Sequence, residues 1–239
     1  TDQWVDVAKS FDAKTILFVA KHVGGFCWWQ TETSEYGIKN TPYKNGKGDV
    51  LDDLIASVKK SNMQMGIYIY PGDQAHWGNR VGTGGITHDP LKQEAYNKVF
   101  RGQYAEVLGR FKDCPALLNE LWFDGSCKIE LTDIISKYAP DALIFQGPLA
   151  NVRWCGNEGG TLPYPAWNSL SSDDLRTGVA TVNQSNPNGD AWAPLEVDIP
   201  NMGHRWIWSP KNEADMRSVE NLLKCYYLSV GRGGVFLLN

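Results

Sequence analysis

Residues 116–125 read Ala-Leu-Leu-Asn-Glu-Leu-Trp-Phe-Asp-Gly, an apolar run that meets a carboxylate and then stops on a glycine. A strand buried on both faces has this nearly continuous hydrophobic character, so we predict a strand that ends on Asp124. In α/β barrels and open α/β sheets the carboxyl ends of the strands carry the reactive groups. Asp124 is therefore a candidate site residue. The alternative is that Asp124 caps the helix that follows.

The rest of the chain alternates strand-like and helix-like segments. Seven apolar runs are strand candidates: 15–20, 65–70, 116–124, 142–146, 179–182, 195–198 and 234–238. Helical spacing of apolar residues predicts helices from 48–49 to 59–60, at 91–111, at 129–138 and at 216–230. Strand, loop and helix in repeated order are typical of a parallel sheet with long loops at one end. We predict an α/β fold, a (β/α)8 TIM-like barrel that lacks its first strand, as one domain over residues 1–239.

Composition excludes several classes of protein. With 42% hydrophobic and 21% charged residues, the 239-residue chain has the composition of an ordinary globular domain. The net charge of −4 argues against nucleic acid or an anionic membrane as partner. No Gly-x-Gly-x-x-Gly follows a strand, and the five scattered cysteines lack the spacing of a zinc site. We therefore predict no metal and no organic cofactor. Ten tryptophans and ten tyrosines favour a carbohydrate site, although most aromatic residues pack in cores.

Reactive side chains follow several of the predicted strands. The first strand leads to His22, the second to Tyr68, and the third to Trp122 and Asp124. The loop after the fourth strand reads Arg-Trp-Cys-Gly-Asn-Glu-Gly-Gly over 153–160 and contains Glu158. A carboxylate at a strand end and a second one on a flexible loop form the pair that glycoside hydrolysis needs. Two acids in any barrel fit this pattern, so spacing alone is a weak indication.

Seven segments of the chain resemble glycoside hydrolase family 29, the α-L-fucosidases. They are AKHVGGFC (20–27), IKNTPYKNGKGDV (38–50), GIYIYP (66–71), ELWFDG (120–125), RWCGNE (153–158), WAPLEVD (192–198) and SVGRGG (229–234). Their order along the chain is the order in the family, and they extend over nearly the whole sequence.

The resemblance implies a role for each matching residue. Asp124 matches the catalytic nucleophile of a retaining mechanism, and Glu158 matches the acid/base of the subgroup that prefers α-1,3/1,4-linked fucose. His22 and Tyr68 match residues that hydrogen-bond the fucose hydroxyls, and Trp122 matches an aromatic residue of the pocket wall. The implied activity is exo-hydrolysis of terminal α-linked fucose through a covalent fucosyl-enzyme intermediate. The two carboxyl groups of such enzymes lie about 5–5.5 Å apart.

Several assignments keep an alternative. Glu196, on a short predicted strand, competes with Glu158 as proton donor and is otherwise a substrate or supporting ligand. Arg153 either steadies Glu158 or the substrate, or is an ordinary exposed loop arginine. His22 is alternatively a buried structural histidine. Three tryptophans either line the side of the site that receives the rest of the glycan or belong to the core: Trp28, Trp29 and Trp154.

The chain also departs from the family pattern. Where many relatives have a second histidine and an aspartate, it has Val23 and Gly24, so one hydroxyl contact is lost or is supplied by another group such as Gln30. The first strand and the C-terminal β-sandwich of the family are absent from the sequence, which we interpret as truncation at both ends. A barrel that lacks one strand has two unpaired edges.

We therefore predict a retaining exo-α-L-fucosidase that acts on a fucosylated oligosaccharide or glycoconjugate. The alternative is a catalytically incompetent, lectin-like or vestigial barrel that binds fucose. The family implies an extracellular or periplasmic location, although no signal peptide opens the sequence. The sequence predicts neither a nucleic-acid nor a membrane partner, and it gives no indication of oligomeric state.

Overall fold

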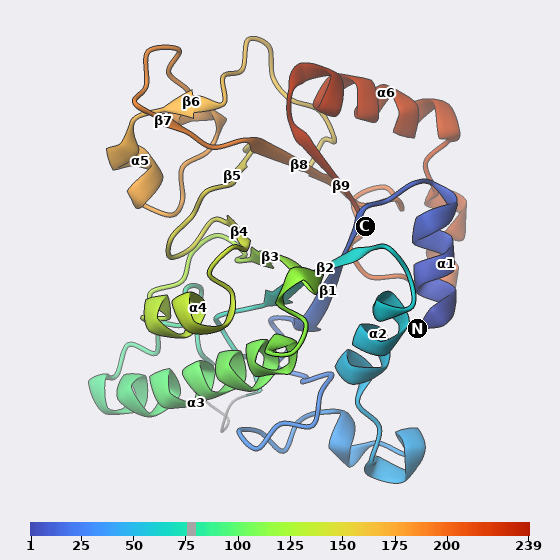
Figure 1. Ribbon diagram of the computed structural model, residues 1–239, viewed down its shortest axis with the longest axis vertical. Helices are drawn as coiled ribbons and strands as arrows, with labels where there is room; N and C mark the ends of the chain where they lie inside the picture. Colours follow the sequence, from blue (N-terminus) through green and yellow to red (C-terminus); the bar gives the residue numbers. More distant parts are fainter. Residues whose placement is uncertain (76–79) are drawn as a thin grey trace. The chain divides into compact units, whose positions relative to one another are not determined.

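The computed structural model describes residues 1–75 and 80–239. The chain forms two compact units, Thr1–Pro148 and Leu149–Asn239, and each has its own parallel sheet (Figure 1). The parallel sheets confirm the α/β class predicted from the alternating pattern. The barrel, and the single domain over residues 1–239, stay predictions.

The first unit is built on a four-stranded sheet in the order β1-β2-β3-β4, in which neighbouring strands are parallel. The strands are β1 (Thr15–Lys21), β2 (Gln64–Ile69), β3 (Leu118–Trp122) and β4 (Leu143–Phe145). Almost every side chain of β2 and β3 is buried, as expected for a parallel sheet covered on both faces. Tyr68 pairs in register with Trp122, and Trp122 pairs with Phe145, so three aromatic residues lie side by side near the carboxyl ends of these strands.

The described part of this unit contains the α-helices α1 (Asp2–Ser10), α2 (Val50–Lys59), α3 (Pro90–Leu108) and α4 (Thr132–Tyr138). Helix α1 packs beside α2, and α3 packs beside α4 (Figure 1). Short 3-10 helices are η1 (Ile38–Asn40), η2 (Tyr43–Gly46), η4 (Gly109–Phe111) and η5 (Pro115–Leu117). Helix α2 shows why the sequence pattern works, because the apolar residues at helical spacing are its buried ones: Val50, Leu51, Leu54, Ile55 and Val58.

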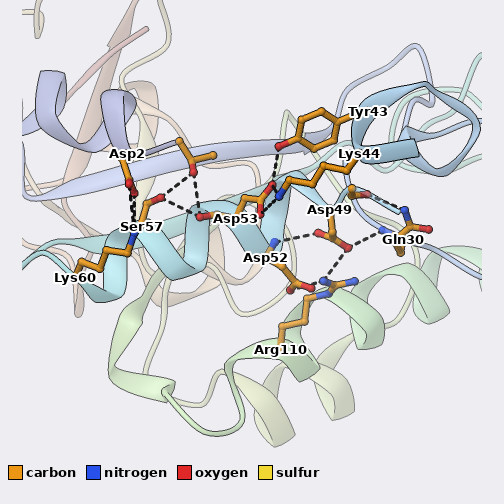
Figure 2. A network of polar contacts seen from close by, with 12 residues as sticks. Asp2, Gln30, Tyr43, Lys44, Asp49, Asp52, Asp53, Ser57, Lys60 and Arg110 are labelled. Carbon is orange, nitrogen blue, oxygen red and sulfur yellow. Dashed lines mark hydrogen bonds and ion pairs between the residues drawn. The ribbon is translucent and has the colours of Figure 1, made fainter. Parts of the chain in front are cut away.

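A polar network fixes the start of α2 (Figure 2). Asp49 is the N-cap, and its Oδ1 accepts a hydrogen bond from the backbone N–H of Asp52 at 2.9 Å. Its Oδ2 accepts from the backbone N–H of Gln30 at 2.8 Å and forms an ion pair of 2.9 Å with Arg110. Asp49 is buried, so one carboxylate joins α2, the loop after β1 and the 3-10 turn η4 that follows α3.

The second unit is built on the parallel sheet β5-β8-β9, formed by β5 (Arg153–Trp154), β8 (Leu195–Ile199) and β9 (Val235–Leu238). Strands β6 (Ser169–Leu170) and β7 (Ala191–Trp192) form an antiparallel pair. The helices are α5 (Ser172–Arg176) and α6 (Val219–Ser229), with 3-10 turns η6 (Val182–Gln184), η7 (Pro210–Asp215) and η8 (Val230–Arg232) (Figure 1). Strand β8 lies between β5 and β9, and all five of its side chains are buried, as expected for a central strand.

Two local expectations differ from the structure. The predicted strand at 179–182 is wrong, because this segment enters the 3-10 turn η6, where Thr181 and Gln184 form a capping box. The loop predicted after Pro148 contains the short strand β5, which exists only because it pairs with Leu195 and Glu196 about 40 residues later in the chain. Helix α1 was not predicted, since only Val5 and Ala8 of its nine residues are buried.

Two further observations concern the chain as a whole. Among the described residues no helix is long and apolar enough to cross a membrane. All five cysteines lie in the part of the chain that the structure describes, and each is a free thiol.

Candidate active site

Asp124 lies just beyond the carboxyl end of β3. The strand ends at Trp122, and Phe123 extends its pairing by donating its backbone N–H to the carbonyl of Phe145 at 3.0 Å. Gly125 follows with a φ of +82°, a left-handed conformation that glycine adopts without cost. The next helix, α4, begins only at Thr132 and has Leu131 as its N-cap. The interpretation of Asp124 as a helix cap is therefore wrong.

The carboxylate of Asp124 is held by the side chain of Tyr68. The phenol Oη of Tyr68 donates to Asp124 Oδ2 at 2.9 Å, across 56 positions of sequence. Tyr68 is buried, and this burial, reinforced by the negative charge of Asp124, raises the pKa of the phenol above its ordinary value. The phenol therefore stays protonated at neutral pH and keeps its hydrogen for the bond to Asp124.

Aromatic rings form a row beside this carboxylate. The rings of His22 and Tyr68 are stacked with centroids 5.7 Å apart and planes 8° apart. Tyr68 and Trp122 follow at 5.4 Å, and Trp122 and Phe145 at 4.1 Å. His22 is exposed, so it is not the buried structural histidine of the alternative interpretation. The structure thus brings together four of the predicted site residues from three neighbouring strands: His22, Tyr68, Trp122 and Asp124.

Glu158 lies in the second unit, on the glycine-flanked loop that follows β5, and is exposed. Its Oε2 accepts a hydrogen bond from the indole Nε1–H of Trp206 at 3.1 Å. Trp206 was missed in the sequence, although it belongs to a conspicuous run of Trp-Ile-Trp at 206–208 in which Ile207 and Trp208 are exposed. This indole is the polar group that orients the Glu158 carboxylate.

Glu196 lies on the central strand β8, opposite Trp154 in the register, and is buried. Asp198 is two positions further along, so both carboxylates project to the same face of the sheet. Asp198 Oδ1 accepts a hydrogen bond from the indole Nε1–H of Trp154 at 2.7 Å. Trp154 is therefore oriented by a buried aspartate, a partner that the sequence analysis did not assign to the site.

The side chain of Arg153 is buried, and its guanidinium bonds to backbone carbonyls of the second unit. Its guanidinium donates to the backbone carbonyls of Ala193 at 3.2 Å, Thr181 at 2.9 Å and Trp167 at 2.7 Å. Burial lowers the pKa of this guanidinium to about 10. Arg153 is thus not an ordinary exposed loop arginine. It connects the segments around Trp167, Thr181 and Ala193 to the first residue of β5. A contact of Arg153 with substrate stays a prediction.

The remaining candidates from the sequence lie as follows. Gln30 donates its side-chain amide to the carbonyls of Gly46 at 3.1 Å and Gly48 at 2.7 Å. Trp29 is fully buried, which confirms the core interpretation for this tryptophan. Trp28 is 42% exposed and packs edge-on against Phe26. The side-chain amide of Gln30, which was suggested as a replacement hydroxyl contact, thus bonds to backbone carbonyls just before α2.

A parallel α/β sheet with a carboxylate and stacked aromatic side chains at its carboxyl edge is an arrangement typical of enzymes that cleave glycosidic bonds. Comparison with known proteins agrees and is more specific. The family model described as alpha-L-fucosidase matches residues 1–239. The chain therefore belongs to the alpha-L-fucosidase family, in agreement with the resemblance seen in its motifs.

Individual relatives extend this finding. Alpha-L-fucosidase 1 of Arabidopsis thaliana is 29% identical over 252 residues, which cover 99% of this chain and 46% of that protein. A crystal structure from Bacteroides thetaiotaomicron, described as that of a candidate alpha-L-fucosidase, has a TM-score of 0.86 at 28% identity and covers 99% of this chain and 57% of that one. A GH29 fucosidase from Ruminococcus gnavus, solved in complex with fucose, has a TM-score of 0.79 at 26% identity, with 100% and 52% covered. The chain spans about half the length of these relatives.

Proposed function

We propose that this protein is a retaining exo-α-L-fucosidase that removes terminal α-linked fucose from an oligosaccharide or glycoconjugate. The observation that carries the proposal is the Asp124 carboxylate, held at 2.9 Å by Tyr68 beside the row of His22, Tyr68 and Trp122. Membership of the alpha-L-fucosidase family supports it, as does the fucose bound by the Ruminococcus gnavus relative.

Asp124 acts in this proposal as the nucleophile. Its free oxygen attacks the anomeric carbon while Tyr68 holds the other oxygen, and the glycosidic bond breaks to leave fucose on the carboxylate. His22 and Tyr68 bind fucose hydroxyls, and Trp122 lines the pocket. Water then releases the sugar by a second displacement on the same carbon. Two inversions give net retention.

Glu158 is the proposed acid/base. It protonates the leaving oxygen in the first step and accepts a proton from water in the second. Between the two candidates, Glu158 lies exposed on a loop and Glu196 is buried in the central strand, so Glu158 is the one that can meet a bulky leaving glycan. Glu196, together with Arg153 and Trp154, supports the substrate site.

The finer assignments are part of the same proposal. The segment around Glu158 favours branched α-1,3/1,4-linked fucose as substrate. Such a glycan substrate favours an extracellular or periplasmic location. We further propose that residues 1–239 form one catalytic (β/α) barrel domain. A retaining mechanism places its two carboxyl groups about 5–5.5 Å apart.

Hydrolysis of 4-nitrophenyl α-L-fucoside tests the proposal, with Asp124→Ala as the variant. The control is Asp141→Ala, which changes an exposed aspartate just before the amino end of β4. We expect Asp124→Ala to lose on the order of 10⁴- to 10⁶-fold in kcat, as removal of a catalytic residue that acts in the covalent step does, and Asp141→Ala to keep the wild-type rate. NMR of the first product formed should show the α-anomer. Equal, near-zero rates in all three proteins with fucose still bound would instead identify a binding module.

A second comparison tests the acid/base. Glu158→Ala should lose activity most strongly with poor leaving groups, and azide should restore turnover by forming a fucosyl azide of retained configuration. Glu196→Ala should not respond to azide. Full activity in Glu158→Ala, with azide rescue confined to Glu196→Ala, would assign the proton donor to Glu196.

A further inference from the structure

A buried ion pair lies next to the row of rings and is not used by the chemistry above. Lys21 is the last residue of β1 and directly precedes His22. Its side chain is fully buried, and its Nζ lies 3.6 Å from Oδ2 of Asp73, which is also buried. Burial lowers the pKa of Lys21 and the charge of Asp73 opposes that shift.

Helix α3 holds the lysine end of this pair. Lys21 Nζ donates to Tyr96 Oη at 3.3 Å and lies 5.1 Å from the centre of the Phe100 ring. The Tyr96 hydroxyl in turn donates to the backbone carbonyl of Pro71 at 2.7 Å. Lys21 and the loop after β2 are therefore attached to the same tyrosine.

The aspartate end holds the turn that carries His22. Gly25 has a φ of +85°, and a Cβ at this position would lie 2.2 Å from Asp73 Oδ1, so its backbone rests directly on the carboxylate. The N–H of Gly25 donates to the carbonyl of His22 at 2.9 Å, and the N–H of Gln74 donates to the carbonyl of Val23 at 3.0 Å. Both ends of the turn 22–25 are thus fixed to Lys21 and Asp73.

Stability alone does not explain such a pair. Removing two charges from water carries a large desolvation penalty, and well-packed apolar residues of similar volume are often equally or more stabilising. In some proteins a buried polar or charged pair instead fixes the direction and distance of a contact. What it fixes here is the backbone on both sides of an exposed histidine.

We propose that Lys21 and Asp73 are positioning residues that hold the turn 22–25 so that His22 stays stacked on Tyr68, beside Asp124. This inference rests on the proposed function, in which His22 binds a fucose hydroxyl. Lys21 and Asp73 themselves do not touch the substrate. Their effect on fucose passes through His22.

The test replaces the pair by apolar residues of similar size. Lys21→Met alone leaves Asp73 buried without its partner and is expected to destabilise the fold, so the informative variant is the double change Lys21→Met/Asp73→Leu. The matched control is Lys60→Met/Asp2→Leu, which removes an exposed ion pair of the same unit (Figure 2). We expect the double variant to melt within a few degrees of wild type.

Fucose recognition should nevertheless be weakened in the double variant. We expect Kd for fucose, and KM for 4-nitrophenyl α-L-fucoside, to rise roughly 10- to 100-fold through misplacement of His22, with a smaller change in kcat. The same double change in a His22→Ala background should have little further effect, because residues that act through one another are not additive. Wild-type Kd in the double variant, or effects that add in the His22→Ala background, would overturn the proposal.

A readout without fucose separates this inference from the proposed function. The NMR signals of the His22 ring, assigned from the spectrum of His22→Ala, should carry a ring-current shift from Tyr68 and should lose it in the double variant but not in the control. If wild type neither hydrolyses nor binds fucose while this shift behaves as expected, the proposed function fails and the positioning role stands. If the shift is unchanged in the double variant, the positioning role fails.

Discussion

The hydrogen bond from Tyr68 to Asp124 gives the sharpest test of the candidate site. Tyr68→Phe removes one oxygen atom, the donor that lies 2.9 Å from Asp124 Oδ2, and keeps the ring that stacks between His22 and Trp122. The rings of the site therefore stay in place. The carboxylate loses the group that orients it.

The expected size follows from the kind of hydrogen bond. A hydrogen bond to a charged group contributes about 1.5–3 kcal/mol. If that contribution is lost from Asp124, the proposed nucleophile, kcat/KM falls roughly 10- to 150-fold, because about 1.4 kcal/mol corresponds to a factor of ten. The loss of folding stability should be smaller, since Asp124 is only partly buried and water can replace the phenol.

The chain offers a matched control. Tyr104 is another buried tyrosine of the first unit, and its ring stacks on Phe123 at 5.5 Å, but its hydroxyl has no hydrogen-bond partner among the described residues. Tyr104→Phe should keep wild-type kcat/KM and leave the melting temperature unchanged or higher, because a buried hydroxyl without a partner is unfavourable. Both variants are assayed with 4-nitrophenyl α-L-fucoside and by thermal unfolding. Wild-type kcat/KM in Tyr68→Phe would refute the role of this contact.

Three further changes have defined outcomes. Asp49→Ala removes the N-cap of α2 and an ion pair, and urea unfolding should show a loss of about 2 kcal/mol; an unchanged midpoint would contradict the capping role. Arg153→Met removes a charged donor from three backbone carbonyls, of which those of Trp167 and Thr181 keep a second donor, and the same measurement should show a loss of about 1.5–3 kcal/mol; an unchanged midpoint would contradict this role. Trp206→Phe frees Glu158 and should lower kcat/KM for a fucosylated disaccharide, while kcat/KM for fucosyl fluoride, whose leaving group needs no proton in the first step, stays at the wild-type value; an equal fall for both substrates would argue against it.

Elements with a strong local pattern could be predicted from the sequence. The apolar run of β2 and the helical spacing of α2, with Asp49 directly before it, are local features, and the structure has both elements within a residue or two of their predicted bounds. Strand β5 could not be predicted in this way, because two residues form a strand only when a partner such as β8 lies beside them. The strand prediction for residues 179–182 was wrong because a local pattern was misleading. The β-branched residues of this segment indicated a strand, but Thr181 and Gln184 form the capping box of a 3-10 turn.

The candidate site shows the same division. Asp124 could be placed at a strand end because apolar run, acid and glycine are adjacent in the sequence. Its bond to Tyr68 joins residues 56 positions apart, and the bond between Trp206 and Glu158 joins residues 48 positions apart, so no local pattern contains them. Buried polar contacts such as that of Trp154 with Asp198 were out of reach for the same reason. Residue types indicate which chemistry is available, and the fold decides which groups meet.

The turn 22–25 divides into a part that tolerates change and a part that does not, which matters for redesign. A Cβ at Gly24 would meet no described atom within 4 Å, whereas one at Gly25 would collide with Asp73. Val23 and Gly24 are also the two positions of this turn at which the sequence departs from the family pattern that its motifs resemble. A variant library of this turn should therefore change positions 23 and 24 and keep Gly25 constant. A side chain at position 24 has room, whereas Gly25 keeps the backbone of the turn against Asp73.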